Sequence, residues 1–502
     1  MRQYNCPKDS DLNLPVEIWS TDGVRRIDRA AIEDAGIPGY TLMQRAAQAA
    51  LRLALESYPE ARRWDIVCGG GNNGGDGYAL ARLAVERGIR VRATALVPPE
   101  SLAGDAATAC RDFIAAGGSA EAWNGALDPG AELVVDAILG SGLARSVAGP
   151  FAAAVSEVGR HGAPVLALDI PSGISGDTGE VMGCAVRADH TLTFAGLKSG
   201  LFLADAPDFV GRLSFADLDI PAACRASVPP LLRRMNGAAI RRGLAPRRHG
   251  AHKGDFGHLL LVGGGPGMPG AIRLGGEAAL RTGAGRVSIA TYPGHASFLA
   301  AGRPELMCHG IESGAQLETL LERVSTVAVG PGLGTDAWAR ELLDAVLASG
   351  LPAVVDADGL SLLATRPVRR DGWILTPHPG EAARLLGSSP AAIQKDRIGA
   401  VSEMKRRYGG TVVLKGAGTL VSADAGPPWL CTAGNPGMAA PGMGDLLTGI
   451  VGALLAQGLT LEDAAVAGVD AHARAGDRAS GRTPRGLIAS DLLPELRTQV
   501  NP

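Results

Sequence analysis

The chain has 502 residues, more than one hydrophobic core usually organises, so we expect two domains. Its formal net charge of -3 argues against nucleic acid as the main partner, because nucleic acid attracts a strongly basic surface. The seven cysteines are scattered, and no apolar stretch has the length of a bilayer-spanning segment. We therefore expect a reduced, soluble, cytoplasmic protein that binds neither nucleic acid nor a membrane.

In the first half, short apolar runs alternate with helical patterns, a rhythm typical of α/β domains with parallel sheets. The predicted elements, in chain order, are helices 28–35 and 42–56, strand 65–68, helix 78–87, strand 90–97, helix 106–116, and strands 132–138, 164–170 and 190–194. Functional loops of such sheets gather beyond the carboxyl ends of the strands. Loops 69–77, 140–146 and 171–176 each follow a strand, so we expect them to converge on one cleft.

The composition changes near residues 222–232, where prolines break the pattern, and the same rhythm then restarts. The predicted elements of the second half are strand 258–263, helix 270–282, strands 286–290 and 326–329, helix 338–348, strands 353–356 and 373–376, helices 380–386 and 393–408, strand 411–415, and helices 444–457 and 461–476. The sequence therefore predicts two α/β domains.

A glycine-rich loop, GGGNNGGDG from Gly69 to Gly77, follows the first predicted strand. Free backbone amides and a helix start at one place suit a pyrophosphate. The Asn72-Asn73 pair adds carboxamide oxygens and directional hydrogen bonds. The alternative interpretation is a tight turn that needs glycine and tolerates asparagine.

Two further strands of the first half end in an acid, within VDAILGSG and LDIPSG. A strand-end aspartate is often only a turn former or a helix cap, and that alternative stays open for each. Three polar strand ends in successive units nevertheless favour a shared site. Asn73, Asp136 and Ser172 offer hard oxygen ligands for a cation, and Asp169 remains as a free acid or base.

In the second half, GNPGMAAPGMGD at 434–445 directly precedes a predicted helix. Amides at a helix start can stabilise a transferring phosphoryl group while Asp445 deprotonates an attacking hydroxyl. The strand ends KGAGT, TPHPGE and GPGLG support this interpretation. The alternatives are that His378 only begins a helix between prolines, and that Lys415 is a solvated charge. No GxxxxGK[ST] motif occurs, which excludes a P-loop NTPase.

The combination of NNGGDG, DAILGSG and DIPSG resembles the epimerase domain of the NAD(P)H-hydrate repair enzymes over residues 15–222. The resemblance implies a Rossmann-like, three-layer αβα domain that interconverts the R and S forms of hydrated NADH and NADPH at C6 of the nicotinamide ring. It implies that Asn73, Asp136 and Ser172 hold K⁺, and that Asp169 moves a proton. The implied hydrate contacts are Asn72, Asn73, Gly74, Gly75, Asp76, Gly140, Ser141, Gly142, Leu143, Ala144, Arg145, Ser146 and Asp169.

The string GNPGMA…GMGD, together with TPHPGE and GPGLG, resembles the dehydratase domain of the same enzymes over residues 232–500. The resemblance implies a ribokinase-like α/β domain that dehydrates the S hydrate, using ADP in bacteria and ATP in eukaryotes, with Mg²⁺ on the phosphates. It implies that Asp445 is catalytic. The implied nucleotide contacts are Lys415, Gly416, Ala417, Gly418, Thr419 and Gly444, and the implied hydrate contacts are Ala271, Gly332, His378 and Asp445.

We therefore predict a bifunctional lyase and isomerase that acts on the hydrates of NADH and NADPH (NADHX and NADPHX), uses ADP or less favourably ATP, and forms a homo-oligomer. A second hypothesis is a ribokinase-type vitamin or sugar kinase with an N-terminal nucleotide-binding module. A third is a non-catalytic nucleotide sensor. A kinase would release a stable phosphorylated product, whereas a dehydratase releases phosphate and restores the absorbance of NADH.

Overall fold

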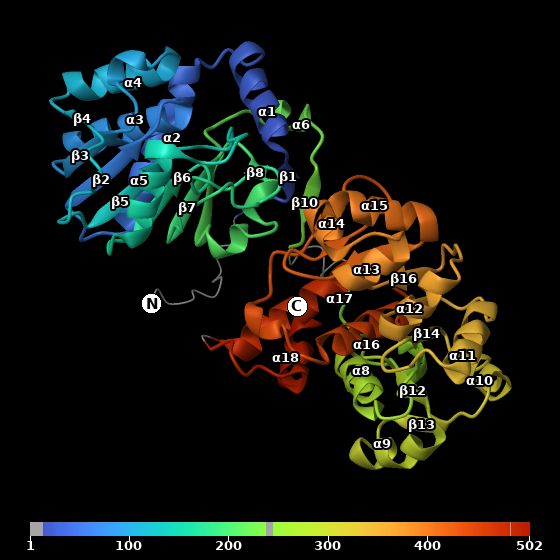
Figure 1. Ribbon diagram of the computed structural model, residues 1–502. Coiled ribbons are helices and arrows are strands. Elements are labelled where there is room, and N and C mark those ends of the chain that lie inside the picture. Colours follow the sequence, from blue (N-terminus) through green and yellow to red (C-terminus); the bar gives the residue numbers. More distant parts are fainter. Residues whose placement is uncertain (1–13, 237–243, 482, 502) are drawn as a thin grey trace. The chain divides into compact units, whose positions relative to one another are not determined.

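The computed structural model describes residues 14–236, 244–481 and 483–501 (Figure 1). The chain divides into two compact units, of which the first ends at Leu232 and the second begins at Arg233. Each unit combines a mainly parallel sheet with helices, as predicted. Among the residues that the structure describes, none of the helices combines the length and the apolar composition that crossing a bilayer requires.

The N-terminal unit is built on a seven-stranded parallel sheet in the order β4-β3-β2-β5-β6-β7-β9. Its strands are β2 (Arg63–Cys68), β3 (Arg90–Ala95), β4 (Ala120–Ala122), β5 (Leu133–Ala137), β6 (Val165–Leu168), β7 (His190–Phe194) and β9 (Arg212–Ala216), and β1 (Glu17–Trp19) pairs separately with β8 (Leu197–Lys198). Its α-helices are α1 (Thr21–Glu33), α2 (Gly39–Ser57), α3 (Asn72–Glu86), α4 (Gly104–Ala115), α5 (Gly149–Arg160) and α6 (Ala222–Ala226).

The sheet of this unit has an apolar cluster on each face. Ile66 of β2 belongs to one cluster, with Tyr78 of α3 and Phe113 of α4. The next residue, Val67, belongs to the other cluster, with Val155 of α5. Because successive side chains of a strand point to opposite faces, the alternation gives a helix layer on either side of the sheet. The predicted Rossmann-like three-layer arrangement is confirmed.

Two helices of this unit begin a full turn or more earlier than the sequence predicts. Helix α3 begins at Asn72 and not at residue 78, so most of the glycine-rich segment is helix and not loop. Helix α1 begins at Thr21 and not at residue 28, because the Ser20 hydroxyl accepts the Gly23 N–H at 3.0 Å and caps the first turn. Glycine content misled the prediction of α3, because glycine is a poor helix former.

The C-terminal unit contains the sheet order β13-β12-β11-β14-β15-β16-β17-β18-β19-β10. The strands from β13 to β17 run parallel, β18 is antiparallel to its neighbours, and β19 pairs parallel with β10. Their bounds are β10 (Leu232–Arg234), β11 (His258–Val262), β12 (Arg286–Thr291), β13 (Met307–Gly310), β14 (Thr326–Val329), β15 (Ala353–Val355), β16 (Trp373–Leu375), β17 (Thr411–Leu414), β18 (Leu420–Val421) and β19 (Trp429–Leu430).

The helices of this unit include four that the sequence did not predict: α9 (Ala296–Gly302), α10 (Gly314–Leu321), α12 (Ala357–Thr365) and α18 (Leu492–Gln499). Those that it did predict are α8 (Pro269–Thr282), α11 (Ala337–Ala348), α13 (Pro379–Leu386), α16 (Met443–Ala456) and α17 (Leu461–Ser480).

The predicted single helix 393–408 is two helices, α14 (Pro390–Lys395) and α15 (Arg397–Tyr408). The break lies at Asp396, whose backbone leaves the helical region. Its carboxylate accepts the Gly399 N–H at 2.8 Å and caps α15.

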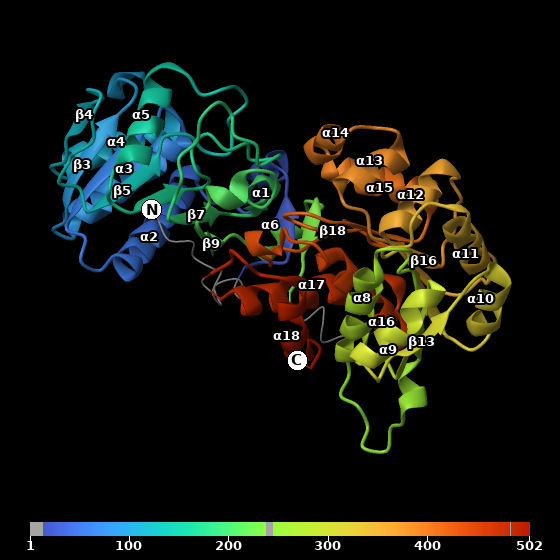
Figure 2. The same ribbon diagram turned by 60° about the horizontal axis from the view of Figure 1, so that its bottom comes forward.

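Helix α16 carries Asp445 in its first turn and is held in place by close packing against α8. The two helices lie side by side (Figure 1, Figure 2). At the crossing, a Cβ added to Gly449 would lie 2.0 Å from the Gly275 carbonyl oxygen, so only glycine allows this approach. The packing of α16 therefore fixes the position of the first turn that carries the acid.

We expect Gly449→Ala to destabilise the C-terminal unit by about 1–3 kcal/mol, because the added methyl forces α8 and α16 apart. Thermal or urea unfolding measures this change. Gly270→Ala is the matched control, because it lies in α8 with no atom within 4 Å of its added Cβ. If both variants unfolded like the parent protein, the close packing of α16 on α8 would not be needed for stability.

Candidate functional site

The three predicted loops of the N-terminal unit meet at the carboxyl edge of its sheet, because β2, β5 and β6 are neighbours. Gly69 donates its N–H to the Ala137 carbonyl at 2.9 Å. Leu139 donates its N–H to the Ser172 hydroxyl at 2.8 Å. Ser141 donates its N–H to Asp169 Oδ2 at 3.0 Å. The tertiary structure thus ties together three segments that lie far apart in the sequence.

The start of α3 presents backbone amides without a side-chain cap. Its N-cap, Gly71, makes no side-chain hydrogen bond, and Asn72 is the first helical residue. A Cβ added to Gly74 would lie 2.0 Å from the Gly69 carbonyl oxygen, so packing also requires glycine here. Uncapped amides and the positive end of the helix dipole suit an anionic ligand group.

Asn73, Asp136 and Ser172 are all buried at this edge. The Ser172 hydroxyl donates to Asp136 Oδ1 at 2.5 Å, and its N–H donates to Oδ2 at 2.8 Å. Within the described residues, neither polar atom of the Asn73 carboxamide has a hydrogen-bond partner. Burial raises the pKa of Asp136 to about 6, against the opposing hydrogen bonds from Ser172. The orphaned buried amide oxygen of Asn73 fits a bound cation, because the ion would supply that oxygen with a partner, and the buried carboxyl at the same sheet edge would supply negative charge.

Asp169 follows β6 in left-handed backbone geometry, with φ of +67°. Burial alone would raise its pKa, but Lys198 and the Ser141 amide lower it below the ordinary value of 3.8. The Lys198 ammonium group donates directly to Asp169 Oδ1. Lys198 was not predicted as a site residue, although it lies shortly after the predicted strand 190–194. Asp169 is therefore a fixed carboxylate.

Two more carboxyls lie in the field of this ion pair. Burial and the carboxylate of Asp169 raise the pKa of Asp76 well above its ordinary value. Burial also raises the pKa of Asp28 to about 6, although Lys198 opposes the rise. Asp28 comes from α1, outside the three motif loops. The site therefore combines an ionised carboxylate with carboxyls that keep their protons more readily.

The loop of residues 140–146 is mostly exposed, and Gly140 and Ser141 link it to the site. A Cβ added to Gly140 would lie 3.2 Å from both Asp169 Oδ2 and Asn73 Cβ. Gly142 lies against the guanidinium group of Arg25, because an added Cβ would be 2.9 Å from Arg25 Nη2. The loop thus borders the acid on one side and a cation on the other.

In the C-terminal unit, Asp445 lies at the uncapped start of α16. Gly442 is the N-cap with φ of +88° and offers no side-chain hydrogen bond to the first turn. Burial and the nearby Asp356 raise the pKa of Asp445 to about 6, against the lowering effect of Lys415. An acid with such a pKa beside free amides can accept a proton near neutral pH.

Lys415 follows β17 and is not the solvated charge that one interpretation allowed. Its Nζ lies 2.6 Å from Asp356 Oδ1 and 3.8 Å from Glu381 Oε2, and its side chain is 17% exposed. Thr448 of α16 donates its hydroxyl to Asp356 Oδ2 at 2.6 Å. A Cβ added to Gly444 would lie 3.4 Å from Lys415 Nζ. The ends of strands β15 and β17 therefore lie close to the start of α16.

Asp356 and Glu381 belong to this candidate site by their contacts with Lys415, although neither was predicted to have a role. Asp356 ends the predicted strand 353–356, and its polar character after a buried strand was the signal that could have identified it. Burial raises the pKa of Glu381, although Lys415 opposes the rise. The next residue after Asp356, Ala357, has φ of +46°, a strained backbone for a residue with a side chain.

The nucleotide loop predicted at Lys415–Thr419 is shaped by Arg397, a residue that was not predicted to have a role. The buried guanidinium group of Arg397 donates to the carbonyl oxygens of Leu414 at 3.1 Å and Gly418 at 3.2 Å. Gly416 has φ of +136°, which favours glycine. Gly416 and Ala417 are both exposed, and the Thr419 hydroxyl donates to the Gly416 carbonyl at 2.9 Å across the loop.

His378 caps α13, as its alternative interpretation proposed. Its Nδ1 accepts the N–H groups of Gly380 at 3.0 Å and Glu381 at 3.3 Å, while its side chain is 51% exposed. Ala271 and Gly332 lie close together, because a Cβ added to Gly332 would be 3.2 Å from Ala271 Cβ. The hydrate contacts predicted for these three residues stay predictions.

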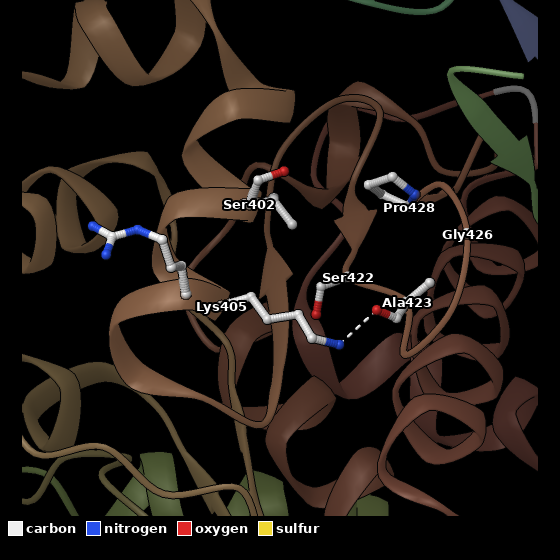
Figure 3. A pocket seen from close by; sticks show the side chains of 8 residues that line it. Ser402, Lys405, Ser422, Ala423, Gly426 and Pro428 are labelled. Carbon is white, nitrogen blue, oxygen red and sulfur yellow. Dashed lines mark hydrogen bonds between the residues drawn. The ribbon is translucent and has the colours of Figure 1, made fainter. Parts of the chain in front are cut away.

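A cavity of about 320 Å³ lies elsewhere in the C-terminal unit (Figure 3). Lys405 Nζ donates to the Ala423 carbonyl at 2.5 Å within it. None of its lining residues belongs to the predicted site: Val401, Ser402, Lys405, Arg406, Ser422, Ala423, Gly426 and Pro428.

The fold of the C-terminal half has a match among solved structures. A ribokinase-like superfamily protein from Enterococcus faecalis is 29% identical, with a TM-score of 0.50, over 54% of this chain and 95% of that one. Together with the Rossmann-like first unit, this likeness defines a class: two-domain α/β proteins with a ribokinase-like second unit.

Both halves also match families by sequence. The family described as NAD(P)H-hydrate dehydratase matches residues 259–497, and the family described as YjeF-related protein N-terminus matches residues 39–200. The bifunctional NAD(P)H-hydrate repair enzyme Nnr of Coxiella burnetii is 45% identical over 97% of this chain and 99% of its own length. Its Escherichia coli counterpart is 42% identical over 99% and 96%. The chain belongs to the family of bifunctional NAD(P)H-hydrate repair enzymes.

Proposed function

We propose that this protein repairs hydrated nicotinamide cofactors at two sites. Residues 15–222 interconvert the R and S forms of NADHX and NADPHX, and residues 232–500 dehydrate the S form to NADH or NADPH with ADP, less favourably ATP, as phosphoryl donor. The observation that carries this proposal is Asp445, a carboxyl of raised pKa at an uncapped helix start beside the Lys415 loop. The relatives support this repair function and not the vitamin or sugar kinase hypothesis.

For dehydration, Asp445 takes the proton of the C6 hydroxyl as that oxygen attacks the terminal phosphoryl group. The bridging P–O bond of ADP breaks, and AMP leaves. The C6–O bond then breaks with phosphate as the leaving group, pushed by the lone pair of the ring nitrogen. Loss of a proton from C5 restores the ring double bond. Hydroxide is a poor leaving group, and these steps replace it with phosphate.

The nucleotide contacts proposed for Lys415–Thr419 and Gly444 agree with exposed loop backbone beside a fixed ammonium group. In the described residues, no three histidine, cysteine or acidic side chains gather so that they would hold a metal on their own. Mg²⁺ would therefore enter on the nucleotide phosphates, whose charge it neutralises.

For epimerisation, the C6–O bond breaks as a proton reaches the departing hydroxyl, and water then adds to the other face and returns the proton. Asp169 is the proposed proton-handling group, and the segments Asn72–Asp76 and Gly140–Ser146 are the proposed hydrate contacts. Asn73, Asp136 and Ser172 would hold K⁺, which would order the loops around the substrate. We further propose a homo-oligomer in the cytoplasm.

The decisive experiment incubates purified protein with mixed R and S hydrate, with and without ADP, and follows both recovery of the reduced cofactor and R-to-S exchange. We expect Asp445→Ala to lower dehydration by at least about 100-fold while exchange persists. Asp169→Ala should slow exchange and leave dehydration of the S form intact. Absence of both reactions in the parent protein would refute the proposed function. Unchanged dehydration in Asp445→Ala would refute the role of Asp445 as the base.

The pH dependence of dehydration tests the state of Asp445 directly. The base must be ionised, and its pKa is raised to about 6 from an ordinary 3.8, so kcat/KM should fall as the pH falls through about 6. Nucleotide binding, measured over the same range, separates this loss from protonation of the phosphates. An acid limb with a midpoint below about 5 would contradict the raised pKa.

Asn73→Ala should abolish the response of exchange to K⁺. In the parent protein, KCl should speed exchange and raise the melting temperature of the N-terminal unit relative to NaCl, because the ion binds only the folded state. The variant should show neither effect. Asn72→Ala is the matched control, since it removes the adjacent carboxamide and should keep the K⁺ response. A K⁺ response that persists in Asn73→Ala would refute the ion site.

A further inference from the structure

A buried lysine, Lys198, lies behind the acid of the N-terminal site. It ends the short strand β8, and its side chain is 2% exposed. Besides Asp169, its ammonium group donates to the Thr193 hydroxyl at 3.0 Å and the Phe194 carbonyl at 3.1 Å. All three N–H bonds therefore have acceptors. Burial of an ammonium group costs so much free energy that it persists only with such partners.

Two contacts fix the side chain of Asp169, one at each carboxylate oxygen. One carboxylate oxygen accepts from Lys198 and the other accepts the Ser141 N–H at 3.0 Å. The backbone of Asp169 has left-handed geometry, which persists in a residue with a side chain only where the surrounding structure holds it. Oδ2 faces Gly140, in the loop proposed to contact the hydrate. Lys198 thus holds the acid from the side away from that loop.

Without the ammonium group, Asp169 would belong to a cluster of carboxyls. Asp28 from α1 and Asp76 from α3 both interact electrostatically with Asp169 and with Lys198. Like charges that are close together raise one another's pKa, so one of three unpaired carboxyls would take up a proton. The positive charge decides that Asp169 stays ionised while its neighbours keep their protons more readily.

We propose that Lys198 is a positioning residue for epimerisation, which holds Asp169 as an oriented carboxylate at the substrate face. This inference rests on the proposed epimerase function and adds a residue that acts through Asp169 without touching the hydrate. The ion pair keeps Asp169 in its proton-accepting form at neutral pH. A neighbouring carboxyl of raised pKa, Asp76, gives a proton to the departing hydroxyl, Asp169 takes a proton from the adding water, and this proton then passes back to Asp76.

The test uses the full chain with Lys198→Met, Lys198→Gln and Lys198→Arg, without nucleotide, so that only exchange is measured. Removal of the charge should lower kcat for exchange near neutral pH by at least about 100-fold, with KM within about threefold. The acid limb of the pH profile should move upward by at least about one unit, because Asp169 loses its cationic partner. Lys198→Arg keeps the charge and should retain the limb of the parent protein.

Dehydration of the S hydrate with ADP is the internal control, since it takes place in the other unit and should be unchanged in all three variants. If Lys198→Met does not fold, Lys198→Gln replaces it, because the carboxamide can still hydrogen-bond to Thr193 and Phe194. An unshifted acid limb in the neutral variants, or a higher KM with unchanged kcat, would overturn the inference. Failure of exchange in the parent protein would instead overturn the proposed epimerase function.

Discussion

At each site, an aspartate at a strand end neutralises an ammonium group that is mostly buried. Lys198 meets Asp169 in the N-terminal unit, and Lys415 meets Asp356 in the C-terminal unit. Because an unpaired buried charge costs several kcal/mol, neither partner of such a pair can move away alone. The neighbouring carboxyls therefore titrate in the field of a fixed positive charge. For Asp445, the positive charge of Lys415 opposes the rise in pKa that burial causes. The resulting pKa of about 6 lies in the range useful for accepting a proton.

The two sites also share the way in which they leave backbone amides free. Helices α3 and α16 begin at Gly71 and Gly442, which provide no side-chain cap, whereas α13 and α15 are capped by His378 and Asp396. The uncapped amides remain available for ligand phosphates. Asp169 and Ala357 have strained, left-handed backbones. Asp169 and the residue before Ala357, Asp356, lie close to these helix starts. Such strain costs about 1–3 kcal/mol and persists only where the surrounding packing holds it.

Two reactions in one chain suit the chemistry of the substrate. Hydration of the nicotinamide ring creates a new stereocentre at C6, and a phosphoryl-transfer site can orient only one of the two hydroxyl configurations for attack. A site that exchanges the configurations makes the whole hydrate pool available to the dehydratase. The two proposed catalytic acids differ in their environment: an ion pair lowers the pKa of Asp169, whereas burial raises the pKa of Asp445.

The sequence by itself determined most strands and helices and the polar residues at the strand ends, because hydrophobic periodicity and glycine spacing are local properties. It could not determine that α3 begins within the glycine-rich segment, where close packing of Gly74 overrides poor helix propensity. Nor could it find the ion pairs, whose partners lie 29 and 59 residues apart. Only the tertiary structure decided which acids are charged, because the pKa of a carboxyl depends on its burial and on partners that folding brings beside it.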